Sequence, residues 1–171
     1  MKKAFKTLLI GSAIAGISLS YNAANAITES NDATVTIVTP LTVTASDDMD
    51  FGKLVSPASG SVTSIVDTSG NLTGTATFVG GTTGSSGTVT ISGTTGETVA
   101  ITITDTTGTT GLGLSNFTGS FGGQSLSGDT LTGANVTSTP TAMNIGATLT
   151  VDSTVSAGTY TPTYDVEVSY N

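Results

Sequence analysis

The last fourteen residues of the chain, 158–171, constrain its fold more than any other stretch. Apolar and aromatic residues occupy the even positions of this segment, and threonine, serine and acidic residues occupy most of the odd ones. A period of two residues predicts a β-strand with one apolar and one polar face. The apolar face has to be covered by neighbours, so we expect this strand to border a core. The residues expected on that face are Tyr164, Val166, Val168 and Tyr170.

A second alternating stretch lies near the start of the chain, over residues 33–43. Its apolar members alternate with threonines, and Pro40 interrupts the run. Proline has no N–H to donate to a ladder, so we predict a strand that either lies at a sheet edge or bends between two sheets. The apolar residues of this predicted strand are Ala33, Val35, Ile37, Leu41 and Val43.

The first 26 residues have the features of a secretory signal. Three lysines within the first six residues precede an apolar run over 7–19, and residues 24–26 form an Ala-x-Ala cleavage site. The apolar run is shorter than the roughly 20 residues that a membrane-spanning helix needs. We therefore predict cleavage after Ala26, export through the periplasm to the cell surface or medium, and a single β-sandwich domain over 27–171.

The composition argues against several classes of function. Beyond residue 26 the chain has one basic residue, Lys53, and twelve acidic residues, a net charge of −11 that would repel nucleic acid. It has no histidine and no cysteine. Acid–base catalysis at neutral pH usually relies on histidine, so we predict a protein that is not an enzyme and that needs no cofactor for catalysis. Without disulfides, the core alone has to stabilise the fold.

The middle of the chain is rich in threonine and glycine, which favours short strands joined by tight turns. Strand-like segments recur every 8–12 residues or so, with no helical period after the signal. We interpret the Gly-Thr-Thr-Gly segments at 81–84, 93–96 and 108–111 as hairpin connections. The pattern predicts an all-β, antiparallel, immunoglobulin-like β-sandwich with Greek-key and meander connections. Whether the sandwich is complete in itself or completed by a donor strand is left open.

Three acidic residues, Asp47, Asp48 and Asp50, lie close together in a predicted turn. Carboxylate oxygens are the ligands that calcium prefers, and calcium is abundant outside cells. Their spacing does not match the twelve-residue calcium loop, and a solvated acidic turn is the alternative interpretation. We therefore consider two interpretations of these three residues, a calcium site and a solvated acidic turn.

Two regions of the chain together resemble known families. The first is the alternating stretch 33–43 with Met49-Asp-Phe-Gly52, and the second is 146–151 with Ala157-Gly-Thr-Tyr160 and the strand ending in Tyr170. This combination resembles a family of secreted bacterial proteins known only as a domain of unknown function. It is also similar to pilin subunits of the archaic chaperone–usher type, the spore-coat-U-like proteins.

The pilin resemblance implies an incomplete immunoglobulin-like sandwich. In such pilins a periplasmic chaperone supplies the missing strand until the N-terminal segment of the next subunit replaces it, at an outer-membrane usher. The resemblance therefore implies that residues 33–43 are the donor strand and that the acceptor lies beside the terminal strand. It also implies further copies of the chain, a chaperone and an usher as partners.

Two hypotheses of function follow. The first is a non-enzymatic structural subunit of a bacterial pilus, fimbria or similar surface polymer, assembled by β-strand addition. The second is a monomeric, secreted or surface-displayed adhesion module that recognises a glycan or a host surface. The size distribution of the purified protein would distinguish them, because a polymer predicts a ladder of sizes and a module predicts a sharp monomer.

Overall fold

The structure is a computed structural model that describes residues 28–171, so the predicted signal and its cleavage site lie outside the described residues. The chain divides into two units, Met1–Val35 and Thr36–Asn171, and the fold described here is that of the second. Every regular element of residues 28–171 is a β-strand. Among these residues no helix is long and apolar enough to cross a membrane.

Ten strands form the domain, and several are close to the alternating segments of the sequence. They are β1 (Thr42–Asp47), β2 (Ser61–Val66), β3 (Leu72–Gly74), β4 (Gly87–Ser92), β5 (Thr98–Asp105), β6 (Leu112–Phe121), β7 (Gln124–Ser125), β8 (Thr130–Asn135), β9 (Thr141–Asp152) and β10 (Tyr164–Tyr170).

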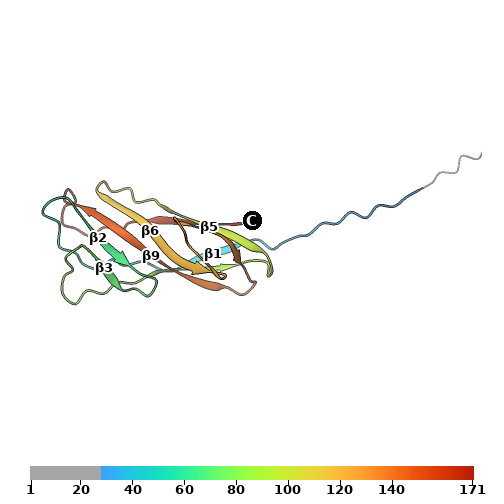
Figure 1. The fold of residues 1–171 in the computed structure, drawn as a ribbon, viewed down its shortest axis with the longest axis horizontal. Helices are drawn as coiled ribbons and strands as arrows, with labels where there is room; N and C mark the ends of the chain where they lie inside the picture. Colours follow the sequence, from blue (N-terminus) through green and yellow to red (C-terminus); the bar gives the residue numbers. More distant parts are fainter. Residues whose placement is uncertain (1–27) are drawn as a thin grey trace, which may run out of the picture. The chain divides into compact units, whose positions relative to one another are not determined.

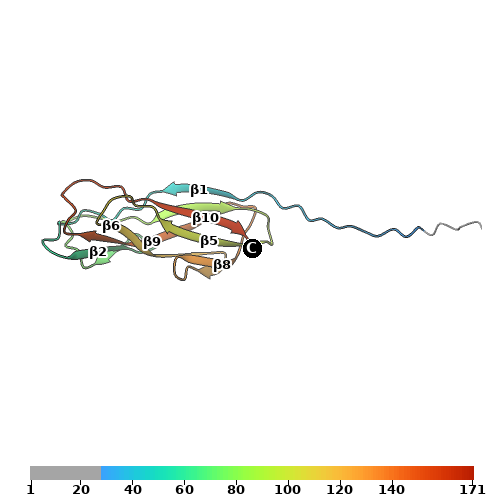
Figure 2. The same ribbon diagram turned by 90° about the horizontal axis from the view of Figure 1, so that it is seen from above.

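The strands form two antiparallel sheets (Figures 1 and 2). The larger sheet is built around β9, the longest strand. On one side of β9, β4 pairs with its first half and β2 with its second half, while β6 pairs on the other side. β1 extends the sheet beyond β4, β3 extends it beyond β2, and β7 pairs with β6. The smaller sheet has the order β10-β5-β8.

The apolar faces of the two sheets form one core. In β4, and in β5 as far as Ile103, every second residue is buried, as the period of two predicts. Ile91 of β4, Ile101 of β5 and Met143 and Ile145 of β9 are fully buried. Two antiparallel sheets that bury their inner faces in a common core make a β-sandwich. The prediction of an all-β antiparallel sandwich is therefore confirmed.

The hairpin prediction for the Gly-Thr-Thr-Gly segments was wrong. Segment 93–96 connects β4 of the larger sheet to β5 of the smaller one, and 108–111 connects β5 back to β6. Segment 81–84 lies in the long connection between β3 and β4. A short glycine-rich turn between two alternating strands fits either a hairpin or a crossing between facing sheets, and the apolar pattern is the same in both. The meander connection predicted from the sequence does occur between β2 and β3, which pair antiparallel.

The strand predicted over 33–43 begins only at Thr42. The chain on either side of Pro40 pairs with no other strand. Residues 28–41 lie outside the strands of the structure. The backbone N–H of Thr39 donates instead to the side-chain hydroxyl of Thr94, at 2.7 Å, and Pro40 has no N–H to donate. After this break β1 pairs antiparallel with β4. At the other end of the chain, only residues 164–170 of the predicted terminal strand pair in a sheet.

Candidate functional site

β10 is an edge strand with one unpaired side. It pairs with β5 along its whole length, from Tyr164 opposite Asp105 to Tyr170 opposite Val99. In the part of the chain that the structure describes, no other strand pairs with β10. An unpaired edge presents backbone N–H and C=O groups that can receive another strand.

The register of β10 identifies which of its residues present these groups. The N–H of Asn171 donates to the carbonyl of Thr98, and the N–H of Thr106 donates to the carbonyl of Thr163. The odd-numbered residues therefore point their backbone groups toward β5. In an antiparallel ladder these groups alternate between the two sides of a strand. The even-numbered residues of β10 thus face the unpaired side with their N–H and C=O groups.

The same even-numbered residues point their side chains at the core, but the core is incompletely covered there. Tyr164, Val166, Val168 and Tyr170 all pack against the buried cluster and are only partly buried. On the neighbouring strand β5, the inward residues Val99, Ile101 and Ile103 are 0, 0 and 3% exposed. Burial of the inner face is therefore complete at β5 and incomplete one strand further out.

The two sheets are joined on the side away from β10. There Asn135 at the end of β8 donates its N–H to the carbonyl of Gly122, which follows β6. The N–H of Phe117 in β6 donates to the carboxylate of Asp129, next to β8, at 2.8 Å. These bonds link the last strand of the smaller sheet to the larger sheet.

On the opposite side the sandwich ends in β1 and β10, which lie near one another in Figure 2. All six residues of β1 are exposed. Among residues 28–171 no ladder and no backbone hydrogen bond joins β1 to β10. We call this side, bounded by β1 and β10, the open side.

Tyrosines fix both ends of β10. At the C-terminal end, the Tyr170 hydroxyl accepts from the N–H of Thr94 and donates to the carbonyl of Thr39, each at 2.8 Å. Thr39 precedes β1, so the end of β10 lies beside the chain that leads into β1. A hydroxyl with both a donor and an acceptor in place is fully hydrogen-bonded.

At the start of β10, the Tyr164 ring packs on Phe117 with 5.5 Å between ring centroids. Burial, helped by the nearby carboxylate of Asp48, raises the pKa of Tyr164, so its hydroxyl is neutral at physiological pH. Gly87 at the start of β4 leaves room for that hydroxyl, and Met49 lies beside it. The start of β10 therefore lies near the end of β1, and the two edge strands run in opposite directions.

The Asp50-Phe51-Gly52 motif is a structural joint. Asp50 exchanges backbone hydrogen bonds with Ser85, and its carboxylate accepts from the N–H of Gly52 at 2.8 Å. Phe51 is buried, and its carbonyl accepts from the buried hydroxyl of Ser64. Gly52 has φ of 72°, a left-handed conformation that favours glycine. The motif ties the segment after β1 to β2 and to the approach to β4.

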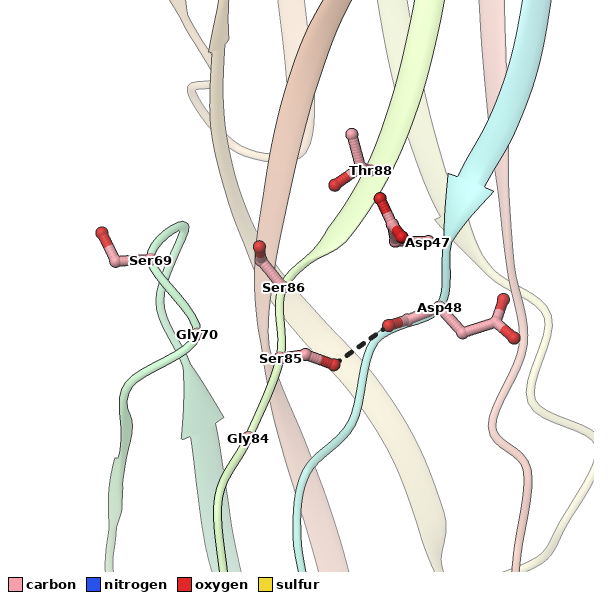
Figure 3. A pocket seen from close by; sticks show the side chains of 8 residues that line it. All are labelled: Asp47, Asp48, Ser69, Gly70, Gly84, Ser85, Ser86 and Thr88. Atoms are coloured by element: carbon pink, nitrogen blue, oxygen red, sulfur yellow. Dashed lines mark hydrogen bonds between the residues drawn. The ribbon is translucent and has the colours of Figure 1, made fainter.

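The structure does not gather the three aspartates proposed as a calcium site. Asp47 and Asp48 both line a polar cavity of about 400 Å³. In Figure 3 their side chains point in different directions, and the Asp48 carbonyl accepts from the Ser85 hydroxyl. The Asp50 carboxylate is occupied by its own turn. Within residues 28–171 no group of three or more His, Cys, Asp or Glu side chains is placed so that it could hold a metal ion. Asp47 and Asp48 are neighbours in an extended chain, so their side chains point to opposite sides.

A larger cleft of about 990 Å³ lies at the Tyr164 end of the open side. Segments 49–56, 79–83 and 155–162 line it. Its rim includes the exposed side chains of Val55, Val79 and Tyr160. Lys53, the single basic residue beyond residue 26, also lines the cleft.

The fold and the open side define the chain as an antiparallel β-sandwich with an unpaired C-terminal edge strand. Residues 41–170 match the family described as a domain of unknown function, DUF4402, and the chain belongs to this family. The predicted membership of a family of unknown function is confirmed at this level. No curated protein and no solved structure matches the chain.

The structure separates the predicted assembly residues into two groups. Tyr164, Val166, Val168 and Tyr170 lie together on β10, as the period of two predicts. Of the other group, Leu41 packs against the core, Val43 lies exposed in β1, and Val35 and Ile37 are 80 and 87% exposed.

Four residues that hold β10 in place were missed from the sequence: Gly87, Gly93, Thr94 and Phe117. The glycines at the two ends of β4 were the signal available, because a glycine beside a strand often marks a close approach of another chain segment.

Proposed function

We propose that this protein is a structural subunit of a secreted or cell-surface polymer that assembles by β-strand addition. Residues 33–38 of one copy would add to the unpaired edge of β10 in the next copy. The observation that carries the proposal is the open side, where inward-facing side chains are partly buried beside free backbone groups. Main-chain hydrogen bonds would give the added strand its affinity, and alternate side chains would give it its register.

The N-terminal segment has the properties of such a donor. Val35 and Ile37 alternate with threonines and are the two most exposed large apolar side chains found in residues 28–171. Neither residue is part of a strand in its own chain. Burying these exposed apolar side chains against a partner would stabilise the complex by about 25 cal/mol for each Å² of apolar surface removed from water.

The geometry of the domain favours an open chain of subunits. The donor segment leads into Thr39, which is bonded to Tyr170 and Thr94 at one end of the open side. In a head-to-tail arrangement the neighbour's donor enters from the opposite end, beside Tyr164. Such a contact joins two different surfaces and leaves the assembly with one free donor at one end and one free edge at the other, so it propagates.

The proposal includes export. The signal-like start supports passage through the periplasm, where a chaperone would protect the open side and an outer-membrane usher would release the assembled chain. The net charge of −11 after residue 26 would keep unassembled copies apart and soluble.

Deleting residues 27–38 tests the proposal. This variant keeps Thr39 and all of β1, so its sandwich should stay folded and remain monomeric. We expect it to take up a labelled peptide of residues 28–38, which co-elutes with it in size-exclusion chromatography and raises its melting temperature, because a ligand of the folded state stabilises that state.

The matched control is the same peptide with Val35→Asp and Ile37→Asp, which should not bind. A folded truncated protein that ignores the unmodified peptide, together with a full-length protein that stays monomeric at high concentration, would refute strand addition.

The cleft at the Tyr164 end favours a second candidate function, a monomeric adhesion module. Its rim displays Tyr160, Val55 and Val79, and an exposed aromatic ring beside apolar side chains suits the faces of sugar rings. This candidate is supported instead if the full-length protein is a sharp monomer that binds neutral oligosaccharides and loses that binding on Tyr160→Ala.

A further inference from the structure

The structure points to one register for the added strand, and this inference rests on the proposed function. We propose that the donor lies antiparallel to β10 of the neighbouring copy, with Ile37 opposite Tyr164. The other pairs in this register are Val35 opposite Val166, Ala33 opposite Val168 and Asn31 opposite Tyr170.

The face of the sheet to which each side chain points limits the choice of register. The even-numbered residues of β10 present free backbone groups and have inward side chains. Residues directly opposite each other in a ladder point their side chains to the same face. Even-numbered donor residues would bring Asp32, Thr34 and Thr36 onto the core face, with Val38 as their single apolar member. Odd-numbered donor residues place Ala33, Val35 and Ile37 there, so an odd residue of the donor has to oppose an even residue of β10.

Thr39 excludes the register shifted two residues in one direction. That register would place Thr39 opposite Tyr164 and would require both its N–H and its carbonyl for the new ladder. In its own domain the N–H of Thr39 donates to Thr94, and its carbonyl accepts from Tyr170. The following residue, Pro40, cannot donate. Ile37 is thus the last odd residue of the donor that is free to pair.

Burial disfavours the shift in the other direction. With Val35 opposite Tyr164, Ile37 would stay outside the added strand. Asn31 and Glu29 would then lie opposite Val168 and Tyr170 on the core face. Burying a carboxylate without a partner is strongly unfavourable. The proposed register places Val35 and Ile37, the two most exposed apolar side chains, on the core face and leaves Glu29 beyond the end of β10.

The direction of the added strand distinguishes a neighbour from the chain itself. Thr39 lies at the Tyr170 end of β10, so a segment that folded back along its own β10 would run parallel to it. A neighbour in a head-to-tail polymer enters from the Tyr164 end and runs antiparallel. The proposed pairs therefore belong to two copies of the chain.

Cysteine cross-linking tests the register directly, because the chain has no cysteine of its own. Val168→Cys serves as the single acceptor and is combined in turn with Ala33→Cys, Val35→Cys or Ile37→Cys in the full-length protein. Opposite residues of a hydrogen-bonded pair have Cα atoms about 5.5 Å apart, within the range of a disulfide. A slip of two residues moves the partner by about 7 Å along the strand, outside that range.

We expect the pair 33/168 to give a ladder of covalently linked chains on non-reducing gels after mild oxidation, with the other two pairs at least tenfold weaker. A ladder from 35/168 or 37/168, or a disulfide within one chain from any pair, overturns the register. If no pair reacts while the truncated protein still takes up the peptide of residues 28–38, the register is wrong and strand addition stands. If no pair reacts and the truncated protein does not bind the peptide, both the register and strand addition are refuted.

Discussion

Gly93 is the residue at which the C-terminal strand, the chain before β1 and the core meet. A Cβ atom at this position would lie 2.6 Å from the Tyr170 hydroxyl, 2.8 Å from Leu41 and 3.3 Å from Val136. The hydroxyl cannot retreat without losing its bonds to Thr94 and Thr39. The absence of a side chain here is therefore needed to fix the end of β10 and the position of Thr39, where the proposed donor segment ends.

Gly93→Ala is expected to lower the free energy of unfolding by about 1–3 kcal/mol, the usual cost of overpacking a closely packed site. Gly108→Ala is the matched control, because nothing lies within 4 Å of a Cβ at that position. Urea denaturation of the two variants measures the difference. Equal stability of both would show that the Tyr170 end is loosely packed.

Single residues account for what the sequence did and did not predict about the site. Tyr164 to Tyr170 could be assigned to one face because alternation is local information. The glycines that seat Tyr164 and Tyr170 could not be assigned, since they are separated from them by about 77 residues and the contact depends on how the sheets stack. The three aspartates are not gathered for local reasons, because the adjacent side chains of Asp47 and Asp48 diverge in extended backbone and the Asp50 carboxylate accepts from the N–H of Gly52.

At the scale of elements, β10 combines an inward and an outward face of different chemistry. Val168 packs against the core, and the next residue, Ser169, is exposed. On the open side nothing in residues 28–171 covers the inward face completely. β10 is therefore the element on which the stability of the sandwich and the proposed assembly both depend.

Val168→Asp and Ser169→Asp place the same charge one residue apart on β10. The first puts a carboxylate against the apolar core and should cost about 2–3 kcal/mol of unfolding free energy. The second leaves the charge in water and should change stability by less than about 0.5 kcal/mol. Thermal unfolding of both variants in the monomeric, truncated background is the measurement. Similar losses in both would mean that the face assignment of β10 is wrong.

Element boundaries show where the sequence stops being informative. The second alternating run extends through Pro40 in the sequence, yet the ladder starts at Thr42, since Thr39 bonds to side chains of other segments instead. The Gly-Thr-Thr-Gly turns cross between sheets where hairpins were predicted. In both cases the pairing partner is a long-range property that a period of two does not encode.

At the scale of the whole molecule, the positions of the proposed donor and of the free edge limit the kind of assembly that strand addition could give. In the proposed polymer the donor leaves the sandwich beside Tyr170, and the neighbour's donor enters beside Tyr164. In a symmetric dimer joined at its two Tyr170 ends, each donor would run parallel to the β10 it joins. Antiparallel addition instead leaves one free edge and one free donor after every step.

We therefore expect purified full-length protein to give a regular ladder of sizes, with spacing of one subunit and without a predominant dimer, on light scattering coupled to size-exclusion chromatography. The ladder should shift to longer species as concentration rises, and should collapse to monomer when a large excess of the peptide of residues 28–38 occupies every free edge. Ile37→Asp is the matched control, because it leaves the sandwich intact and removes the largest donor side chain, so it should remain monomeric. A single closed dimer at all concentrations would contradict head-to-tail addition, since a closed assembly consumes both the donor and the edge of each copy.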